Sequence, residues 1–350
     1  MKRKQNNLLG IFRFSIFLTV ILAGVTFWQL SWQGLWLFFV LLILEVTFSF
    51  DNAVVNSRTL ASMSLIWQRI FLTVGIFIAV FAVRFLLPIV IVIFASGLNF
   101  GEVVSMALNN PERYSHVLHD ASPIINAFGG IFLLMIGLSY FVDYNKQIHW
   151  VRGVEPWLAR AGKFENFRAC LILLVMVVLY FTVEEKYKAM ILISSVLGTL
   201  LHIGLELFGS LFGSHSSKDI KLKTGWAAFA AFLYLEVLDA SFSFDGVIGA
   251  FAITSSVILI TSGLSAGAIW VRSLTIYLMR SGTLSKYRYL EHGAHWAIVA
   301  LGIMMLFKLF HVELPEWITG SLGLAFIILA IGSSVIEARH AKNTKNLQSS

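Results

Sequence analysis

Cysteine and charge are both scarce in this sequence. One cysteine, Cys170, excludes a disulfide framework and a cage of thiolate ligands around a metal. Charged residues make up 13% of the 350 residues, whereas soluble domains carry roughly 25%. This shortage, together with a mean hydropathy of +0.81, indicates a chain that lies mostly in lipid.

Apolar residues fill the chain in long runs and reach 58% of the total. About ten runs are long enough to cross a bilayer, which takes roughly 20 residues each. They lie near 9–29, 35–56, 70–95, 122–142, 167–183, 189–213, 225–253, 256–279, 294–311 and 317–337. No short alternating segments typical of a membrane barrel occur, so we predict an all-α, polytopic helical membrane protein with about ten spans.

Basic residues predict how the spans are oriented. Lys and Arg concentrate at the amino terminus, in the links after the second, fourth, sixth and eighth spans, and in the tail. Cytoplasmic loops are the basic ones, so we expect both termini in the cytoplasm of a bacterial cell and the chain in its inner membrane. Loop charge then accounts for the net charge of +7, and no nucleic-acid partner is expected. The first run is too long for a signal peptide, so we treat it as a retained span.

Two stretches of the chain repeat one motif. "LEVTFSFDNAV" (44–54) aligns with "LDASFSFDGVI" (238–248), and "FSFD" is identical in both. The copies lie on spans that are an odd number apart, so they run in opposite directions, as in transporters built from inverted repeats. The predicted divisions are a flanking span at 1–34, a three-helix repeat at 35–142, a basic loop with two connecting spans at 143–224, a second three-helix repeat at 225–311, and a last span with a polar tail at 312–350.

Carboxylates are the unusual content of both copies. A charge at the bilayer centre costs about 2.5–3.5 kcal/mol on insertion scales, so intramembrane acids indicate a functional site by default. Carboxylate, amide and hydroxyl oxygens suit hard divalent cations such as Mn²⁺, Mg²⁺ and Ca²⁺. We therefore predict a cation site with no resident cofactor and no catalytic residue. The motif residues that offer such oxygens are Glu45, Asp51, Asn52, Asp239 and Asp245.

Further polar residues are expected to support this site: Ser49, Ser243, Glu236, Arg84, Arg272 and Lys308. On ideal helices Asp51 and Asp245 lie off the faces that carry the other acids. Both can join them only where a helix unwinds, which Gly246 permits in the second copy. The acids of this set are Glu45, Asp51, Glu236, Asp239 and Asp245, and the cations are Arg84, Arg272 and Lys308. If all are ionised, two negative charges remain, which one divalent cation would neutralise.

Several of these residues have structural alternatives. Buried acids can be protonated and relay protons instead of binding a metal. Glu236 can be a core acid paired to Arg272, and both arginines can be structural counterions. Lys308 can extend its amine to the membrane surface, and the two serines can serve helix packing.

The motifs of this chain resemble those of the TerC-like integral membrane proteins. In the first half of the chain the resemblance rests on "EVTFSFDNAVV" (45–55), "LIWQRIFLTVGIFIAVFAVRF" (65–85) and "GGIFLLMIG" (129–137). In the second half it rests on "SFSFDGVIGAFAIT" (241–254), "AIWVRSLTIYL" (268–278) and "YRYLEHGAHWAIVALGIMMLFKLF" (287–310). The family is named for tellurium resistance, and several members resemble Mn²⁺ exporters. The resemblance implies an ion-site role for Glu45, Asp51, Asn52, Asp239 and Asp245.

Our expectation is a secondary transporter that exports a divalent cation by alternating access, with Mn²⁺ as the leading candidate. Its partners would be the lipid bilayer, the cation and a proton counter-ion. The alternative is a membrane scaffold of a stress or tellurium-resistance complex that docks partner proteins through the basic loop. An intramembrane aspartyl hydrolase on Asp51 and Asp245 lacks a Gly-Asp context, so we expect no enzyme.

Overall fold

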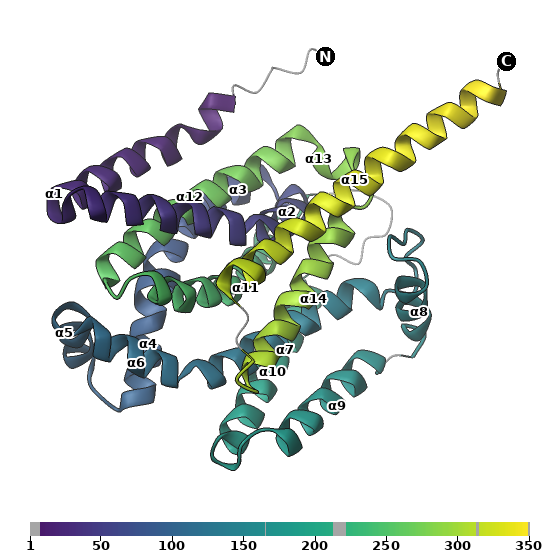
Figure 1. Ribbon diagram of the computed structural model, residues 1–350. Helices are drawn as coiled ribbons and strands as arrows, with labels where there is room; N and C mark the ends of the chain where they lie inside the picture. The colour runs from purple at the N-terminus through teal and green to yellow at the C-terminus, as the bar shows by residue number, and fades with distance from the viewer. Residues whose placement is uncertain (1–7, 165, 213–221, 313–314, 349–350) are drawn as a thin grey trace. The chain divides into compact units, whose positions relative to one another are not determined.

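The computed structural model describes residues 8–164, 166–212, 222–312 and 315–348 (Figure 1). The predicted all-α class is confirmed, because every regular element in these ranges is helical. In chain order the elements are α1 (Leu8–Phe48), α2 (Phe50–Ala61), α3 (Leu65–Phe77), the π-helix η1 (Ile78–Leu86), α4 (Leu87–Ser96), α5 (Phe100–Asn109), α6 (Pro111–Asp120), α7 (Ser122–Phe141), α8 (Val154–Ala161), α9 (Phe167–Thr182), the 3₁₀-helix η2 (Glu185–Tyr187), α10 (Lys188–Phe212), α11 (Gly225–Ile253), α12 (Val257–Ser281), α13 (Thr283–Lys286), α14 (Leu290–Lys308) and α15 (Glu316–Gln348).

Eight helical segments in the described ranges are long and apolar enough to cross a membrane. The sequence predicts about ten, and the difference has two causes. Helix α1 covers two predicted spans as one element that bends at Ser31, where φ is 57°. Helix α9 has 16 residues, which extend over about 24 Å and so fall short of a bilayer core of about 30 Å.

The chain folds into two compact units, each made of two separate stretches. Unit 1 comprises residues 1–125 and 203–281, and unit 2 comprises 126–202 and 282–350. The predicted repeats at 35–142 and 225–311 each run through both units, so their boundaries stay a prediction.

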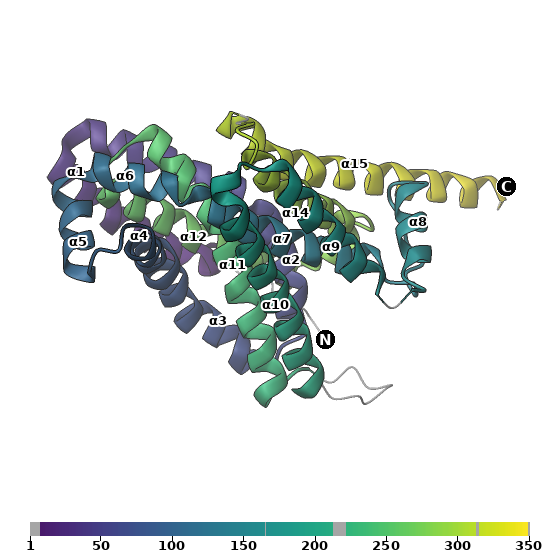
Figure 2. The same cartoon turned by 90° about the horizontal axis from the view of Figure 1, so that it is seen from below.

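In unit 1, both arms of α1 pack along α12, and the short helices α4, α5 and α6 pack on one another (Figures 1 and 2). Phe38 and Leu41 of α1 are fully buried with Leu264 of α12 in one apolar cluster. By contrast Trp28 and Trp36 are 85% and 70% exposed, which suits a surface that contacts lipid.

The third predicted span is a continuous rod made of α3, η1 and α4. Pro88 is the second residue of α4, directly after η1, and has no N–H to donate to the preceding turn. The rod nevertheless continues past Pro88 and ends at Gly97, whose φ of 70° suits a glycine cap.

In unit 2, α7 and α14 lie in close contact, and α15 packs along α14. A Cβ atom added at Gly130 of α7 would lie 3.0 Å from the carbonyl oxygen of Gly302, so small residues bring the two backbones together.

The basic loop of unit 2 is anchored through one buried carboxylate, Glu155 of α8. Its Oε2 lies 2.7 Å from His292 Nδ1 and accepts the backbone N–H of Trp150 at 2.8 Å, while Oε1 accepts Trp296 Nε1 at 2.9 Å. Burial alone would raise the pKa of Glu155, but these bonds outweigh it and lower the pKa from 4.5 to about 2. The ionised form therefore holds the loop to α14.

We predict that E155Q lowers the stability of the protein at pH 7 by about 1.5–3 kcal/mol, because hydrogen bonds to a charged group are lost. The folded-state pKa is depressed, so the contribution is present above pH 4.5 and disappears as the pH falls towards 2. Thermal unfolding in nanodiscs should show the gap between E155Q and wild type narrowing as the pH is lowered.

The matched control is E337Q, which breaks the exposed Arg288–Glu337 pair of unit 2. Exposed pairs contribute about 0–1 kcal/mol, so E337Q should change little. An E155Q midpoint equal to that of E337Q at pH 7 would contradict the anchoring role.

Candidate functional site

The first motif copy lies where α1 passes into α2. Helix α1 ends at Phe48 and α2 begins at Phe50, and Ser49 between them has φ −100° and ψ 15°. The hydrogen bond from Ala53 N to Ser49 O, 3.1 Å long, continues the helical pattern, so the break is a one-residue distortion. In the second copy α11 is continuous through Gly246, so the unwinding expected there does not occur, and the first copy shows only the distortion at Ser49.

The two motif copies lie against each other in opposite directions. Asn52 Nδ2 donates to Asp239 Oδ1 at 2.8 Å, and a Cβ atom added at Gly246 would lie 3.3 Å from Glu45 Oε2. In the sequence alignment Glu45 corresponds to Asp239 and Asn52 to Gly246. Each contact is therefore the counterpart of the other, as an inverted repeat requires.

Arg84 reaches the first copy from the π-helix η1. It forms a short ion pair with Glu45, and its Nη1 donates to the carbonyl oxygen of Ala79 at 2.9 Å. Both side chains of the pair are 1% exposed. π-helical turns frequently occur at functional sites, and here the altered winding belongs to the element that carries the buried guanidinium.

Arg272 of α12 reaches the second copy in a tighter arrangement. Its two terminal nitrogens bond Glu236 at 2.9 and 2.8 Å, and Nη1 also donates to the carbonyl oxygen of Phe71 at 3.1 Å. The guanidinium stacks over the Phe71 ring, with its carbon 4.3 Å from the ring centroid. The alternative in which Glu236 pairs with Arg272 is thus present, in the bidentate geometry that arginine favours.

A glycine of α3 makes room for this pair, and sequence reasoning missed it. A Cβ atom at Gly75 would lie 2.6 Å from Glu236 Oε1 and would also collide with Arg272. A glycine stands nine residues before each arginine, Gly75 before Arg84 and Gly263 before Arg272. Gly263 meets Leu41 and Phe38 and no charged residue, so this spacing does not reveal the role of Gly75.

Asp239 lies between the two arginines and is the least well paired of the three acids that contact them. Its Oδ2 lies 3.5 Å from Arg272 Nη2 and 3.8 Å from Arg84 Nη1, whereas charge-assisted bonds measure about 2.7–2.9 Å. These contacts join five side chains of unit 1, which we call the charge cluster: Glu45, Arg84, Glu236, Asp239 and Arg272.

Unsatisfied oxygen atoms lie beside the charge cluster. Asn52 Oδ1 and Ser243 Oγ are buried and have no hydrogen-bond partner in the structure, while Ser49 Oγ donates to Glu45 at 3.1 Å. Ser243 lies one helical turn from Asp239 on the same face of α11. Buried polar atoms are nearly always paired, so unpaired ones mark a place for water or an ion.

The remaining predicted site residues have different outcomes. Asp51 is buried, and its side chain accepts the backbone N–H of Asn52 at 2.9 Å, with no contact to the arginines recorded among the described residues. The side chain of Asp245 lies outside the described part of the chain. Lys308 ends α14 and belongs to unit 2, so its place in the site stays a prediction.

The described residues form no ready-made metal cage. No group of three or more His, Cys, Asp or Glu side chains among them is close enough to hold a metal ion. Guanidinium groups occupy the space between the carboxylates instead. A cation that binds here must therefore use few carboxylates together with amide and hydroxyl oxygens.

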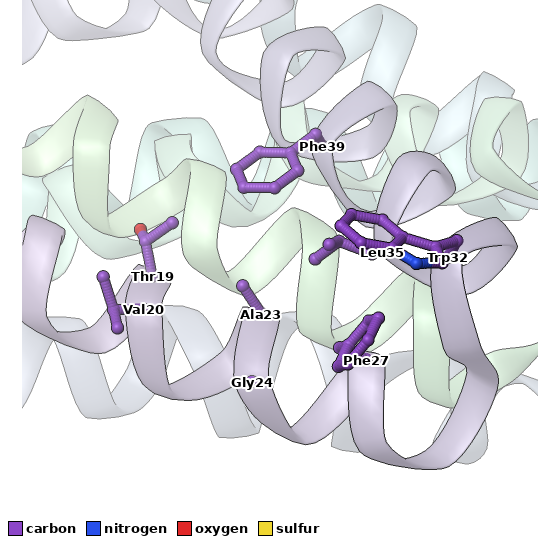
Figure 3. A pocket seen from close by; sticks show the side chains of 8 residues that line it. All are labelled: Thr19, Val20, Ala23, Gly24, Phe27, Trp32, Leu35 and Phe39. Carbon is purple, nitrogen blue, oxygen red and sulfur yellow. The ribbon is translucent and has the colours of Figure 1, made fainter.

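Two open hollows of unit 1 lie apart from the charge cluster. Figure 3 shows the first, of about 460 Å³, between the arms of α1 on either side of Ser31. Its lining is almost wholly apolar: Thr19, Val20, Ala23, Gly24, Phe27, Trp32, Leu35 and Phe39. The second, of about 640 Å³, is formed by α5, α6 and the turns beside them. Neither is lined by a predicted site residue.

The fold and the charge cluster define a polytopic helical membrane protein with arginine-paired acids buried in its interior. The chain belongs to a family described as "Protein of unknown function (DUF475)", which matches it over residues 50–341. That match covers the whole second motif copy and residues 50–54 of the first. No curated protein and no solved structure matches the chain.

We predict that G75A destabilises the protein by about 1–3 kcal/mol, because the added methyl overpacks the Glu236–Arg272 pair. Thermal unfolding of the purified protein measures the effect. G24A is the control, since a Cβ atom at Gly24 meets nothing within 4 Å. Equal midpoints for G75A and G24A would show that the pair does not need this space.

Proposed function

We propose that this protein is a secondary transporter that carries a hard divalent cation across a bacterial inner membrane by alternating access. Mn²⁺ is the leading candidate for that cation. One observation carries the proposal. Two oppositely directed copies of an acidic motif meet at Asn52 and Asp239 inside the apolar protein, with unpaired oxygens beside them. A stable core has no use for unsatisfied groups of this kind, whereas a binding site does.

The chemistry of the cluster supports a cation as cargo. Three acids and two arginines leave one uncompensated negative charge, and Asp51 adds another when it is ionised. The available atoms are carboxylate, amide and hydroxyl oxygens, the donors that Mn²⁺, Mg²⁺ and Ca²⁺ accept. The arginines would serve as internal cations that compensate the acids when the site is empty.

The resemblance to TerC-like proteins supports export as the direction and Mn²⁺ as the first ion to test. Protons are the proposed counter-ion, because buried carboxylates titrate readily. The distribution of Lys and Arg supports cytoplasmic termini. The contacts of Asn52 with Asp239 and of Glu45 with Gly246 support two motif-bearing helices that run in opposite directions. Rocking of one repeat against the other would expose the site alternately to each side.

We expect D239N and D51N to abolish Mn²⁺ flux into liposomes, since each removes a buried carboxylate of the motif. D245N tests the corresponding acid of the second copy. The control is E112Q, which changes an exposed acid of the same unit and should transport like wild type. A panel of divalent ions with and without a pH gradient identifies the cargo and the counter-ion. Mn²⁺ flux by D239N and D51N at the wild-type rate would refute the proposal.

A further inference from the structure

The three acids of the charge cluster are not equivalent. The repeat alignment pairs Glu45 with Asp239, so these two are counterparts. Glu236 aligns with Leu42, an apolar residue. The second copy therefore carries one acid more than the first, and this extra acid breaks the symmetry of the cluster.

The extra acid holds Arg272 in a fixed position. Both terminal nitrogens of Arg272 bond Glu236, one also bonds the carbonyl oxygen of Phe71, and the guanidinium rests on the Phe71 ring. Gly75 leaves the space in which this pair lies. These four contacts hold the guanidinium against Glu236 and Phe71, and its Nη2 comes no closer than 3.5 Å to Asp239.

Asp239 is left incompletely neutralised as a result. It approaches Arg272 only to 3.5 Å, although its repeat counterpart Glu45 makes a short ion pair with Arg84. Asn52, the residue that donates to Asp239, has an unpaired Oδ1, and Ser243 Oγ is unpaired one turn further along α11. Asp239 Oδ2 therefore has no bond of ordinary length, and the two unpaired neutral oxygens belong to residues beside it, whereas Glu45 and Glu236 are each closely paired with an arginine.

We propose that Glu236 is a positioning residue that keeps Arg272 off Asp239, so that Asp239 is the carboxylate of the cluster available to the cation. The inference rests on the proposed function. Glu45 and Glu236 then hold arginines and do not bind cargo. Without Glu236, Arg272 turns to Asp239, its nearest remaining acid, and occupies the site with a built-in cation.

The test is Mn²⁺ titration of purified protein in nanodiscs, read as the shift of the unfolding midpoint. E236Q should weaken binding roughly 10–100-fold, as the loss of a residue that supports a metal ligand typically does. E236Q/R272Q should restore binding to near the wild-type affinity, because the competing guanidinium is gone. A direct ligand role for Glu236 gives the opposite result, with no restoration in the double variant, and overturns the inference.

A second measurement needs no metal and separates this inference from the proposed function. D239N should lower the metal-free midpoint little in wild type and much more in the E236Q background, where Asp239 has become the partner of Arg272. Equal shifts in both backgrounds would overturn the positioning role. If wild type binds no Mn²⁺ but the shifts are unequal, the cation proposal fails and the positioning role stands.

Discussion

Charge inside an apolar chain is the constraint on which this structure depends. Each buried guanidinium and carboxylate has lost the solvation of water, and only partners within the protein compensate for that loss. Glu45 with Arg84 and Glu236 with Arg272 provide such partners at less than 7% side-chain exposure. Removing one member of a buried pair typically costs about 3–5 kcal/mol, so the helices that carry these residues are held in one mutual arrangement.

Backbone features allow the pairs to form at this depth. Gly75 has no side chain, and the guanidinium of Arg272 occupies the space that a Cβ atom would fill. At the first copy the backbone departs from helical geometry at Ser49, and Arg84 projects from a π-helix. These local departures from regular helix cluster around the charged residues, as expected where function and packing compete for the same positions.

The two units use buried carboxylates differently. In unit 2, both oxygens of Glu155 are bonded to His292, Trp296 and the backbone of Trp150, so the acid serves as an anchor. In unit 1, Asp239 has one oxygen without a bond of ordinary length and unsatisfied neighbours. Because of this contrast, we assign Glu155 to the stability of the fold and make Asp239 of unit 1 the centre of the functional proposal.

Composition and local order in the sequence determined the class of protein, the positions of the helices and the pairing of the two motif copies. Apolar runs must be helical in lipid, and a repeated "FSFD" is visible without coordinates. The sequence could also name Glu45, Asn52, Asp239 and the arginines, since charge in such runs is conspicuous. Which arginine holds which acid, and which acid is paired least closely, only the tertiary structure decided. Those pairings depend on small differences in distance between side chains on helices far apart in the chain, where a glycine or a one-residue distortion determines which side chains meet.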